Sequence, residues 1–224
     1  MKKLLFSLAL LATTSFVNAQ EFKQMEGEKN LELQFTPLGG TPLGISGLRF
    51  RYFTSNTMAI RANVFVGYNN TSTITQDANT TNGANDKELK NSESSFTFNL
   101  RPGFESHFEG TDRLSPYVGA ELDLNFKRTS SVSQSQPDND IVETTSTNKE
   151  GAFRFGLNGL AGFDYYFAKH LYFGAELGLG LSYTSPFTTV TKSGSVSVES
   201  NENKDAIFNF GPIVNSAIRL GFLF

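Results

Sequence analysis

The chain has 224 residues, a formal net charge of −3, two histidines and no cysteine. The slightly acidic balance argues against a dedicated nucleic-acid binder, and without cysteine the chain carries neither disulfides nor a lipoprotein anchor. It holds 22 Phe, 7 Tyr and 20 Gly but no Trp, and its mean hydropathy is negative. Such an average is typical of a water-soluble chain. It also fits a transmembrane β-barrel, because only alternate residues of each strand face lipid.

Residues 1–19 have the pattern of a secretory signal peptide. Lys2 and Lys3 form a basic start, and residues 4–12 form an apolar run that is too short to cross a bilayer as a helix. Small residues before position 20 predict cleavage after Ala19. The alternative is a short membrane anchor, which no further apolar run supports. The expected organisation is a signal peptide at 1–19, a short periplasmic lead at 20–29 and one barrel domain at 30–224.

After this lead, apolar and polar residues alternate with a period of two in eight runs. In the first run Leu31, Leu33 and Phe35 share one face, which predicts a β-strand because successive side chains of a strand point to opposite faces. Pro102 lacks a ladder donor and weakens the fourth strand locally. The eight expected strands are 31–36, 47–52, 58–68, 96–108, 118–127, 153–167, 171–183 and 217–224.

The connections between these runs differ in length by position. Short turns are expected at 39–42, 54–57, 109–112 and 168–170, and polar loops of about 20 residues at 69–91, 129–150 and 185–204. Bacterial outer-membrane barrels have even strand numbers, short periplasmic turns and longer external loops, whereas a soluble sandwich has no reason to separate loops by length. The pattern therefore predicts an all-β fold, an eight-stranded antiparallel transmembrane up-and-down β-barrel.

The face opposite the apolar one carries six acids and six arginines. A barrel of eight strands leaves room only for side chains or one small ligand, so enclosed charges must pair. A soluble barrel with a Phe-rich core is the alternative, but its lumen could not hold so many large side chains. Matched depth predicts the pairs Arg61–Glu105, Arg101 with Glu121 or Asp123, and Arg219–Glu176. The predicted lumen charge network is Glu32, Arg49, Arg51, Arg61, Arg101, Glu105, Glu121, Asp123, Arg154, Asp164, Glu176 and Arg219.

The last strand is expected to close the ring by pairing with residues 31–35, with Arg219 inward. Its outward residues are predicted to be Ile218, Leu220, Phe222 and Phe224. A weak internal repeat relates residues 117–122, Tyr-Val-Gly-Ala-Glu-Leu, to residues 172–177, Tyr-Phe-Gly-Ala-Glu-Leu, each of which follows a short turn.

On these residues, and on the signal that ends Asn18-Ala19-Gln20, the mature chain resembles the small OmpA/OmpX-like outer-membrane β-barrels of Gram-negative bacteria. It is most similar in kind to the porin-family β-barrel domain proteins common in Bacteroidetes. The resemblance implies integral insertion in the outer membrane by the barrel-insertion machinery, which reads the terminal strand. The assembly role then falls on Ile218, Leu220, Phe222 and Phe224.

The chain offers little material for catalysis. His107 is expected inward beside Glu105 near the periplasmic rim, and His170 in a periplasmic turn, which is the wrong end for an enzyme that acts on outer-leaflet lipid. The acidic segment 138–140 is expected to be solvated and not a calcium site. The sequence therefore predicts no enzyme, no cofactor and no metal.

The leading functional hypothesis is a non-catalytic barrel with a closed, charge-paired interior and a structural or surface-interaction role through long external loops. A narrow porin-like channel for small hydrophilic or ionic solutes is the alternative. A transporter of hydrophobic solutes is disfavoured because its lumen would be apolar. The expected partners are outer-membrane lipids and lipopolysaccharide, the barrel-insertion machinery and an extracellular ligand at the loops. We expect a monomer that binds no nucleic acid.

Overall fold

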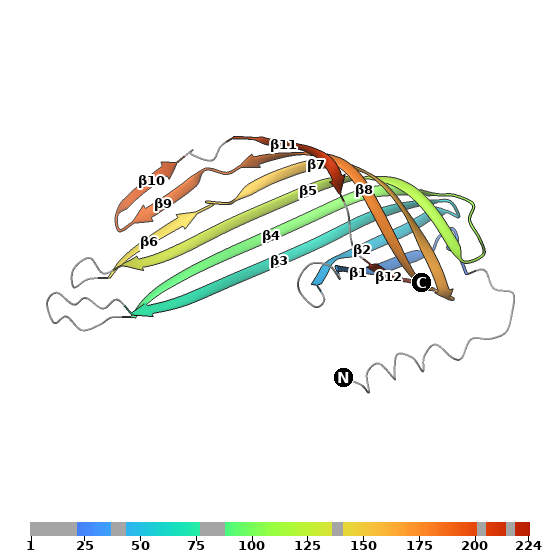
Figure 1. Cartoon of the computed structure of the whole chain (residues 1–224), viewed down its shortest axis with the longest axis horizontal. Coiled ribbons are helices and arrows are strands. Elements are labelled where there is room, and N and C mark those ends of the chain that lie inside the picture. Colours follow the sequence, from blue (N-terminus) through green and yellow to red (C-terminus); the bar gives the residue numbers. More distant parts are fainter. Residues whose placement is uncertain (1–21, 37–43, 77–87, 136–140, 201–204, 214–217) are drawn as a thin grey trace, which may run out of the picture.

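The structure, a computed structural model, describes residues 22–36, 44–76, 88–135, 141–200, 205–213 and 218–224. The described residues form twelve strands (Figure 1). No helix among them is long and apolar enough to cross a membrane. The strands are β1 Lys29–Thr36, β2 Gly44–Ser55, β3 Met58–Gln76, β4 Glu88–His107, β5 Leu114–Ser135, β6 Val142–Thr147, β7 Ala152–Ala168, β8 Leu171–Pro186, β9 Thr189–Ser193, β10 Val196–Ser200, β11 Ile207–Ile213 and β12 Ile218–Leu223.

Eight of these strands close into a ring of antiparallel pairs. The order is β1, β2, β3, β4, β5, β7, β8 and β12, and β12 pairs with β1 from Asn30↔Leu223 to Phe35↔Ile218. The expected last strand, 217–224, corresponds to β12, and β11 pairs with β8 further along the same strand as an additional segment that was not predicted. The predicted fold, an eight-stranded antiparallel barrel closed by its last strand, is confirmed.

The pairing also fixes the stagger of the ring. Two paths of paired residues lead from Leu33 of β1 to β5, one through β2, β3 and β4 and the other through β12, β8 and β7. They arrive at Leu124 and Leu114, ten residues apart on one strand. With about 3.3 Å per residue and about 4.8 Å between strands, this stagger tilts the eight strands by about 40° from the barrel axis.

The turns predicted at 54–57, 109–112 and 168–170 lie together at one end of the ring, with the C-terminus; we call it the turn end (Figure 1). The predicted long loops are largely strand, which corrects the sequence analysis. β3 continues to Gln76, β4 begins at Glu88 and β5 reaches Ser135, while β6, β9 and β10 lie wholly within expected loops. The turn predicted at 39–42 lies outside the described residues.

The extra strands lack the apolar–polar alternation from which the other strands were predicted, and this has a physical reason. Beyond the ring both faces of the sheet meet water, so Ser, Thr and Asn occupy both faces and the apolar–polar alternation disappears. Thr and Val still favour an extended backbone. In β3, for example, Thr71, Thr73 and Ile74 all have exposed side chains, and the strand nevertheless pairs with β4 residue by residue as far as Gln76↔Glu88.

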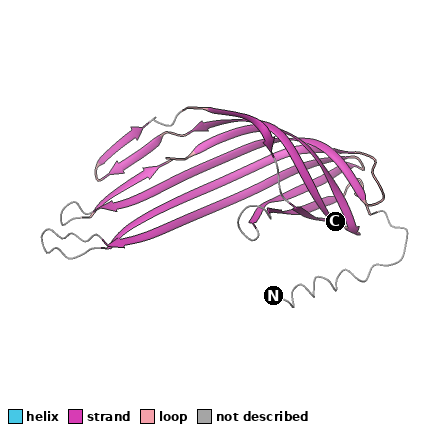
Figure 2. Cartoon of the chain, viewed as in Figure 1, coloured by secondary structure: helices cyan, strands magenta, loops and turns pink. Residues whose placement is uncertain are grey.

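The ring is complete only towards the turn end. The β2–β3 ladder stops at Leu48↔Val64, while β3 runs on for another 12 residues, Phe65–Gln76, beside β4. Among the described strands, β11 pairs only with β8. The far end is therefore an open curved sheet that begins at the edge of β3 and passes through β4, β5, β6 and β9 to β10 (Figure 2). We call it the far-end sheet.

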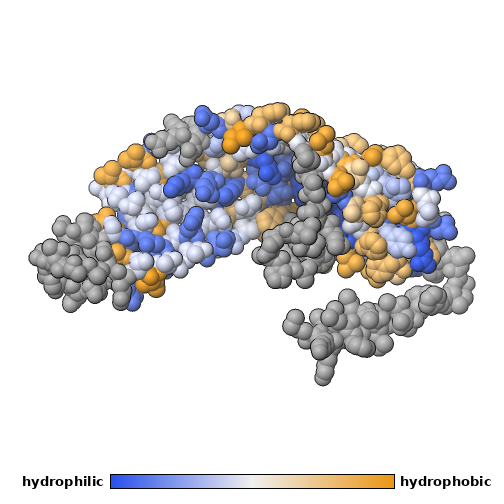
Figure 3. Space-filling view, viewed as in Figure 1, coloured by the Kyte–Doolittle hydropathy of each residue, from blue (hydrophilic) through white to orange (hydrophobic). Residues whose placement is uncertain are grey.

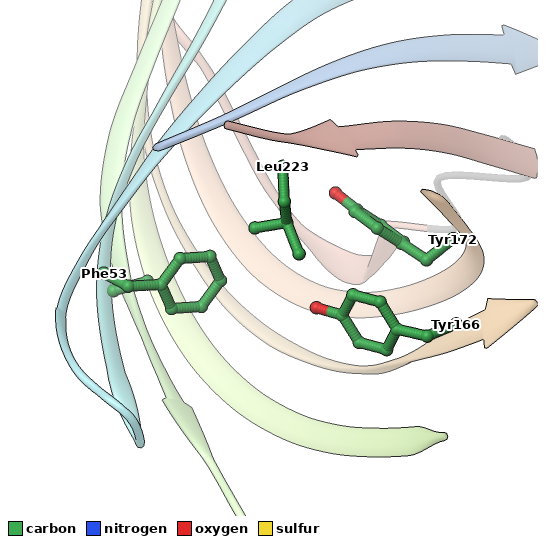
Figure 4. Packing of buried hydrophobic residues seen from close by; sticks show 5 residues of the cluster. Phe53, Tyr166, Tyr172 and Leu223 are labelled. Carbon is green, nitrogen blue, oxygen red and sulfur yellow. The ribbon is translucent and has the colours of Figure 1, made fainter. Parts of the chain in front are cut away.

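Large apolar side chains cover the outside of the ring, which appears as the orange end in Figure 3. On the last strand Leu220, Phe222 and Phe224 point outward and Arg219 is buried, as predicted. The side chain of Ile218 lies outside the described residues. Inside, a small apolar cluster closes the turn end, where four of its side chains point towards one another (Figure 4). The cluster consists of Phe53, Ala59, Tyr166, Tyr172 and Leu223, with Phe22 packed against it.

Leu177 of β8 and Ile74 of β3 test where the apolar band ends. Both point outward and have similar exposure, 64% and 62%, but Leu177 lies in the ring and Ile74 in the far-end sheet. We expect Leu177→Arg to lower the free energy of unfolding by about 2–4 kcal/mol, because it places a charge in lipid. Ile74→Arg should cost less than about 0.5 kcal/mol. Urea unfolding in lipid vesicles measures the free energy of unfolding of both variants. Equal losses would contradict the conclusion that the apolar band covers the ring and ends before the far-end sheet.

Candidate functional site

The twelve charged residues predicted in the lumen all lie on the inner face, in two tiers. The upper tier, nearer the far end, consists of Asp123, which is buried, and of Arg101 and Arg154, which are partly exposed. The lower tier is fully buried and consists of Glu32, Arg49, Arg51, Arg61, Glu105, Glu121, Asp164, Glu176 and Arg219. Each comes from an inward position of a ring strand, so strand register alone brings residues far apart in sequence together.

Arg51 of β2 is the centre of the lower tier. Its Nη2 lies 2.6 Å from Glu32 Oε1, and its Nη1 lies 2.8 Å from both Glu105 Oε2 and Asp164 Oδ2. It also donates a hydrogen bond to the Tyr172 hydroxyl. Removing a guanidinium from water costs several kcal/mol, and only close carboxylates offset that cost. Three acids around one arginine provide such compensation.

Arg61 of β3 repeats this arrangement with other acids. Its Nη1 lies 2.7 Å from Glu105 Oε1 and from Glu176 Oε2, and its Nη2 lies 3.0 Å from Glu121 Oε2. Arg49 reaches the same Glu176 at 3.0 Å, so Glu176 joins two arginines. Because Glu105 also binds Arg51, the lower tier is one continuous network. Breaking one contact in such a network leaves several groups with fewer partners.

Two of the three predicted pairs have the expected partners. Arg61 meets Glu105, and Arg101 Nη1 lies 3.4 Å from Glu121 Oε1. Arg219 and Glu176 both lie in the lower tier and attract each other, but the acids closest to Arg219 are others: its Nη2 lies 3.0 Å from Asp164 Oδ1, and its Nη1 lies 3.5 Å from Glu32 Oε1. The expectation rested on depth counted from the turns. Arg219 is paired with Gly174 of β8, which is paired with Asp164 of β7, so the long side chain passes over the glycine to an acid two strands away.

Two tyrosines of the network were missed as site residues. The Tyr117 hydroxyl donates to Glu176 Oε2 at 2.6 Å, and the Tyr172 hydroxyl donates to Glu32 Oε1 at 2.5 Å. The internal repeat could have revealed them, because Tyr117 and Tyr172 are its first residues and Glu121 and Glu176 its fifth. Residues four apart on a strand share a face. Each copy of the repeat therefore places one tyrosine and one glutamate on the inner face of its strand.

Each tyrosine needs a glycine on the paired strand. Tyr172 is paired with Gly221, and a Cβ at that glycine would lie 2.0 Å from the tyrosine ring. Tyr117 is paired with Gly162, where a Cβ would lie 2.6 Å from the hydroxyl oxygen. Glycine inside a strand often marks a close approach of this kind. The lumen is thus filled by aromatic rings lying flat over glycine backbone as well as by ion pairs.

The lead before β1 also contributes to closure, which the sequence did not reveal. Gln24 is buried; its amide nitrogen donates to Ser115 Oγ at 2.9 Å, and its amide oxygen accepts from the Tyr166 hydroxyl at 3.0 Å. Phe22 lies under the Arg113 guanidinium, 4.3 Å from ring centre to Cζ. Residues 22–28 therefore cover the turn end below the apolar cluster.

His107 lies beside Glu105, as expected, with its Nε2 3.3 Å from Glu105 Oε2 and its Nδ1 2.9 Å from Ser115 Oγ. The order Ser–His–acid is that of a nucleophilic triad. Here Gln24 covers the buried serine, and Glu105 is already bound to two arginines. The contacts therefore describe a hydrogen-bonded rim residue and not an activated nucleophile.

No group of three or more His, Cys, Asp or Glu in the described part of the chain has the geometry of a metal site. The acidic segment 138–140 lies outside the described residues. Chemically, the lumen offers a set of paired charges beneath a partly exposed upper tier. Such an arrangement can fill and stiffen a barrel, and its exposed top can contact polar solutes.

The sequence profile of the OmpA-OmpF-like porin family matches residues 43–224. The comparison with curated proteins gives no match. Among solved structures, the outer-membrane protein AlkL in DMPC bilayers is 14% identical with a TM-score of 0.40, covering 95% of this chain and 97% of that one. The N-terminal β-barrel domain of Pseudomonas aeruginosa OprF is also 14% identical (TM-score 0.30; 90% and 100% covered). Acinetobacter baumannii CarO is 13% identical (TM-score 0.34; 89% and 97% covered).

Arg51 and Arg154 form a matched pair for testing the network. Arg51→Gln should lower the free energy of unfolding by about 3–5 kcal/mol, because it leaves buried carboxylates without their shared cation. Arg154→Gln, at the partly exposed top, should cost less than about 1 kcal/mol. Urea titration of the folded barrel in vesicles gives both values. Similar losses for the two variants would contradict a buried hub at Arg51.

Proposed function

Because the chain belongs to the OmpA-OmpF-like porin family, we propose that it is an integral outer-membrane β-barrel with a non-catalytic, structural or surface-interaction role. In this proposal the signal peptide at 1–19 exports the chain and is removed. The turn end faces the periplasm and the far-end sheet faces outward. The outside of the ring contacts outer-membrane lipid and lipopolysaccharide, and the barrel-insertion machinery reads the terminal strand through Leu220, Phe222 and Phe224.

The observation that carries this proposal is the buried lower tier. Nine charged side chains and the rings of Tyr117 and Tyr172 occupy the lumen, with the apolar cluster and residues 22–28 beneath them. A solute that crossed the ring would have to displace paired charges held at 2.6–3.0 Å. Breaking a buried pair costs about 3–5 kcal/mol, so a cleared passage would be rarely populated.

The far-end sheet supplies the surface for interaction. β5 alone has 22 residues, roughly 70 Å along the strand, whereas the apolar band of such barrels is about 25 Å tall. Much of β3, β4 and β5 therefore projects beyond lipid. It presents Ser, Thr and Asn side chains, which suit hydrogen bonding to polar partners. The expected extracellular ligand would meet the barrel here.

The alternative is a narrow channel for small hydrophilic or ionic solutes. The name of the family and the ionic character of the lumen favour it over a route for apolar solutes. A channel needs a continuous water path through the lower tier. A closed barrel has no continuous water path through the lower tier in its resting state.

Single-channel recording separates the two. The purified barrel in a planar bilayer should give no steady conductance steps. The charge-neutral double variant Arg49→Ser/Glu176→Ser should give more current than the wild type, because it removes two large groups from the lumen without changing its net charge. Each protein is first checked for the heat-sensitive gel mobility of a folded barrel. Regular, ohmic steps from the wild-type protein would refute the closed interior.

Removal of the β9–β10 hairpin tests the surface role. Replacement of Thr189–Ser200 by a short Gly-Ser linker should leave the free energy of unfolding in urea within about 0.5 kcal/mol of wild type, because this hairpin pairs only with β6 among the described strands. Cells that produce the trimmed protein should adhere less to polysaccharide-coated surfaces than cells that produce the full chain at equal levels. Equal adhesion would count against a surface role for this hairpin.

A further inference from the structure

The number of carboxylates that neutralise each lumen arginine decreases from the turn end towards the far end. Arg51 and Arg61 each have three carboxylates within ion-pair distance, and Arg49 and Arg219 have two. Among the described residues, Arg101 and Arg154 have one each. The positive groups at the top of the network are thus the least neutralised. A cation with few partners can accept another anion.

The upper tier also has unused hydrogen-bonding capacity. Arg101 shares its carboxylate, Glu121, with Arg61, and the contact is long at 3.4 Å. Its Nη2 faces the Asn63 side chain, whose oxygen lies 2.9 Å away once that amide is turned to accept. Within the described residues, the Nε atoms of Arg101 and Arg154 have no acceptor although they are shielded from solvent; the same holds for Arg61 and Arg219 of the lower tier, so it is exposure that distinguishes the upper arginines. Each guanidinium therefore keeps a free donor.

Asp123 joins Arg154 to Asn99 in the upper tier. Asp123 Oδ2 lies 2.8 Å from Arg154 Nη2, and Asp123 Oδ1 accepts from the Asn99 amide. The β4–β5 ladder is interrupted here, between Leu100↔Leu124 and Gly103↔Glu121, because Pro102 provides no N–H. Asn99 and Arg154 thus meet at one aspartate at a break in the sheet, while Arg101 is bound to Glu121.

This tier is open towards the far end. The side chain of Arg154 is 41% exposed and that of Arg101 14% exposed, whereas the arginines below are fully buried. Beside β7, which carries Arg154, the wall of β8 and β11 is lined by Gly180 and Gly211, and a Cβ at Gly211 would meet nothing within 4 Å. Figure 3 shows hydrophilic residues gathered on the hollow side of the molecule.

We propose that Arg101 and Arg154 form a binding site for a small oxyanion, a phosphate or a carboxylate, that enters from the far end. A guanidinium presents its donors in a planar fork that matches the oxygens of these anions. The lower tier forms a closed floor, so the bound ion stays on the outer side. Asp123 holds Arg154 in place when the site is empty and competes with the ligand for it.

The inference goes beyond the proposed function and rests on it only for the side from which the anion comes. Binding to the purified barrel is independent of orientation and of conductance. A barrel that conducts would refute the closed interior and leave the binding measurement intact. A barrel that binds no anion would refute this site and leave the surface role intact.

The test uses the folded full-length mature barrel in dodecyl maltoside, whose headgroup carries no phosphate. Signals of arginine Nε–H groups are followed by NMR during titration with inorganic phosphate or citrate, with glucose as the uncharged probe. We expect two arginine signals to shift with either anion and none with glucose. Arg154→Gln should weaken phosphate binding by about tenfold or more, through loss of a charge-assisted contact.

Two further variants sharpen the test. Asp123→Asn should tighten phosphate binding by a few-fold, because it removes the competing carboxylate and keeps the shape of the side chain. Arg128→Gln is the matched control on the same strand: Arg128 is an exposed residue of β5, and its loss should leave the affinity unchanged. Folding of each variant is verified by gel mobility before titration.

Three results would contradict the proposed anion site. No shift with phosphate or citrate at millimolar concentration would overturn the site, as would binding that Arg154→Gln does not alter. Addition of phosphatidic acid to the micelles distinguishes a lipid headgroup from a free ion. Shifts that appear only with this lipid, and not with inorganic phosphate, would overturn the assignment to a soluble oxyanion.

Discussion

Burial of ionised groups in a ring of fixed width is the constraint on which the rest of the structure depends. A stagger of ten residues over eight strands sets how wide the lumen is and which inward positions meet. Within it, each buried guanidinium must find carboxylates or lose several kcal/mol. Arg51 meets this condition with acids from β1, β4 and β7. The network therefore depends on the closure of the ring and at the same time favours that register over alternatives.

The same constraint explains the small residues and the tyrosines of the lumen. A space filled only by arginines and acids would leave gaps, because their side chains are narrow and their polar ends must converge. Tyr117 and Tyr172 fill part of that volume with apolar rings and still present hydroxyls to Glu176 and Glu32. The glycines opposite them give the rings room. Packing and polar satisfaction are thus solved by the same side chains.

Much of the ring could be predicted from the sequence, because lipid outside and a charged lumen inside impose a period of two that is readable residue by residue. The inward position of Arg219 and the outward positions of Leu220 and Phe222 followed from it. Partner choice followed only in part, because a long arginine can pass over a glycine to an acid two strands away, as Arg219 does to reach Asp164. The role of Gln24 carried no signal in the pattern. The strands β6, β9 and β10 were also missed, since water on both faces removes the alternation.

The two-sided exposure of the far-end sheet has a consequence for how this chain can change. In the ring, a residue such as Leu177 must suit lipid and one such as Glu176 must suit several arginines, so few replacements are acceptable. Beyond the ring, residues such as Thr73 and Val196 face water and are tied mainly by backbone pairing. Substitution there changes the outer surface with little cost to the fold. The molecule thus combines a ring in which few replacements are acceptable with a far-end sheet whose surface is free to diversify.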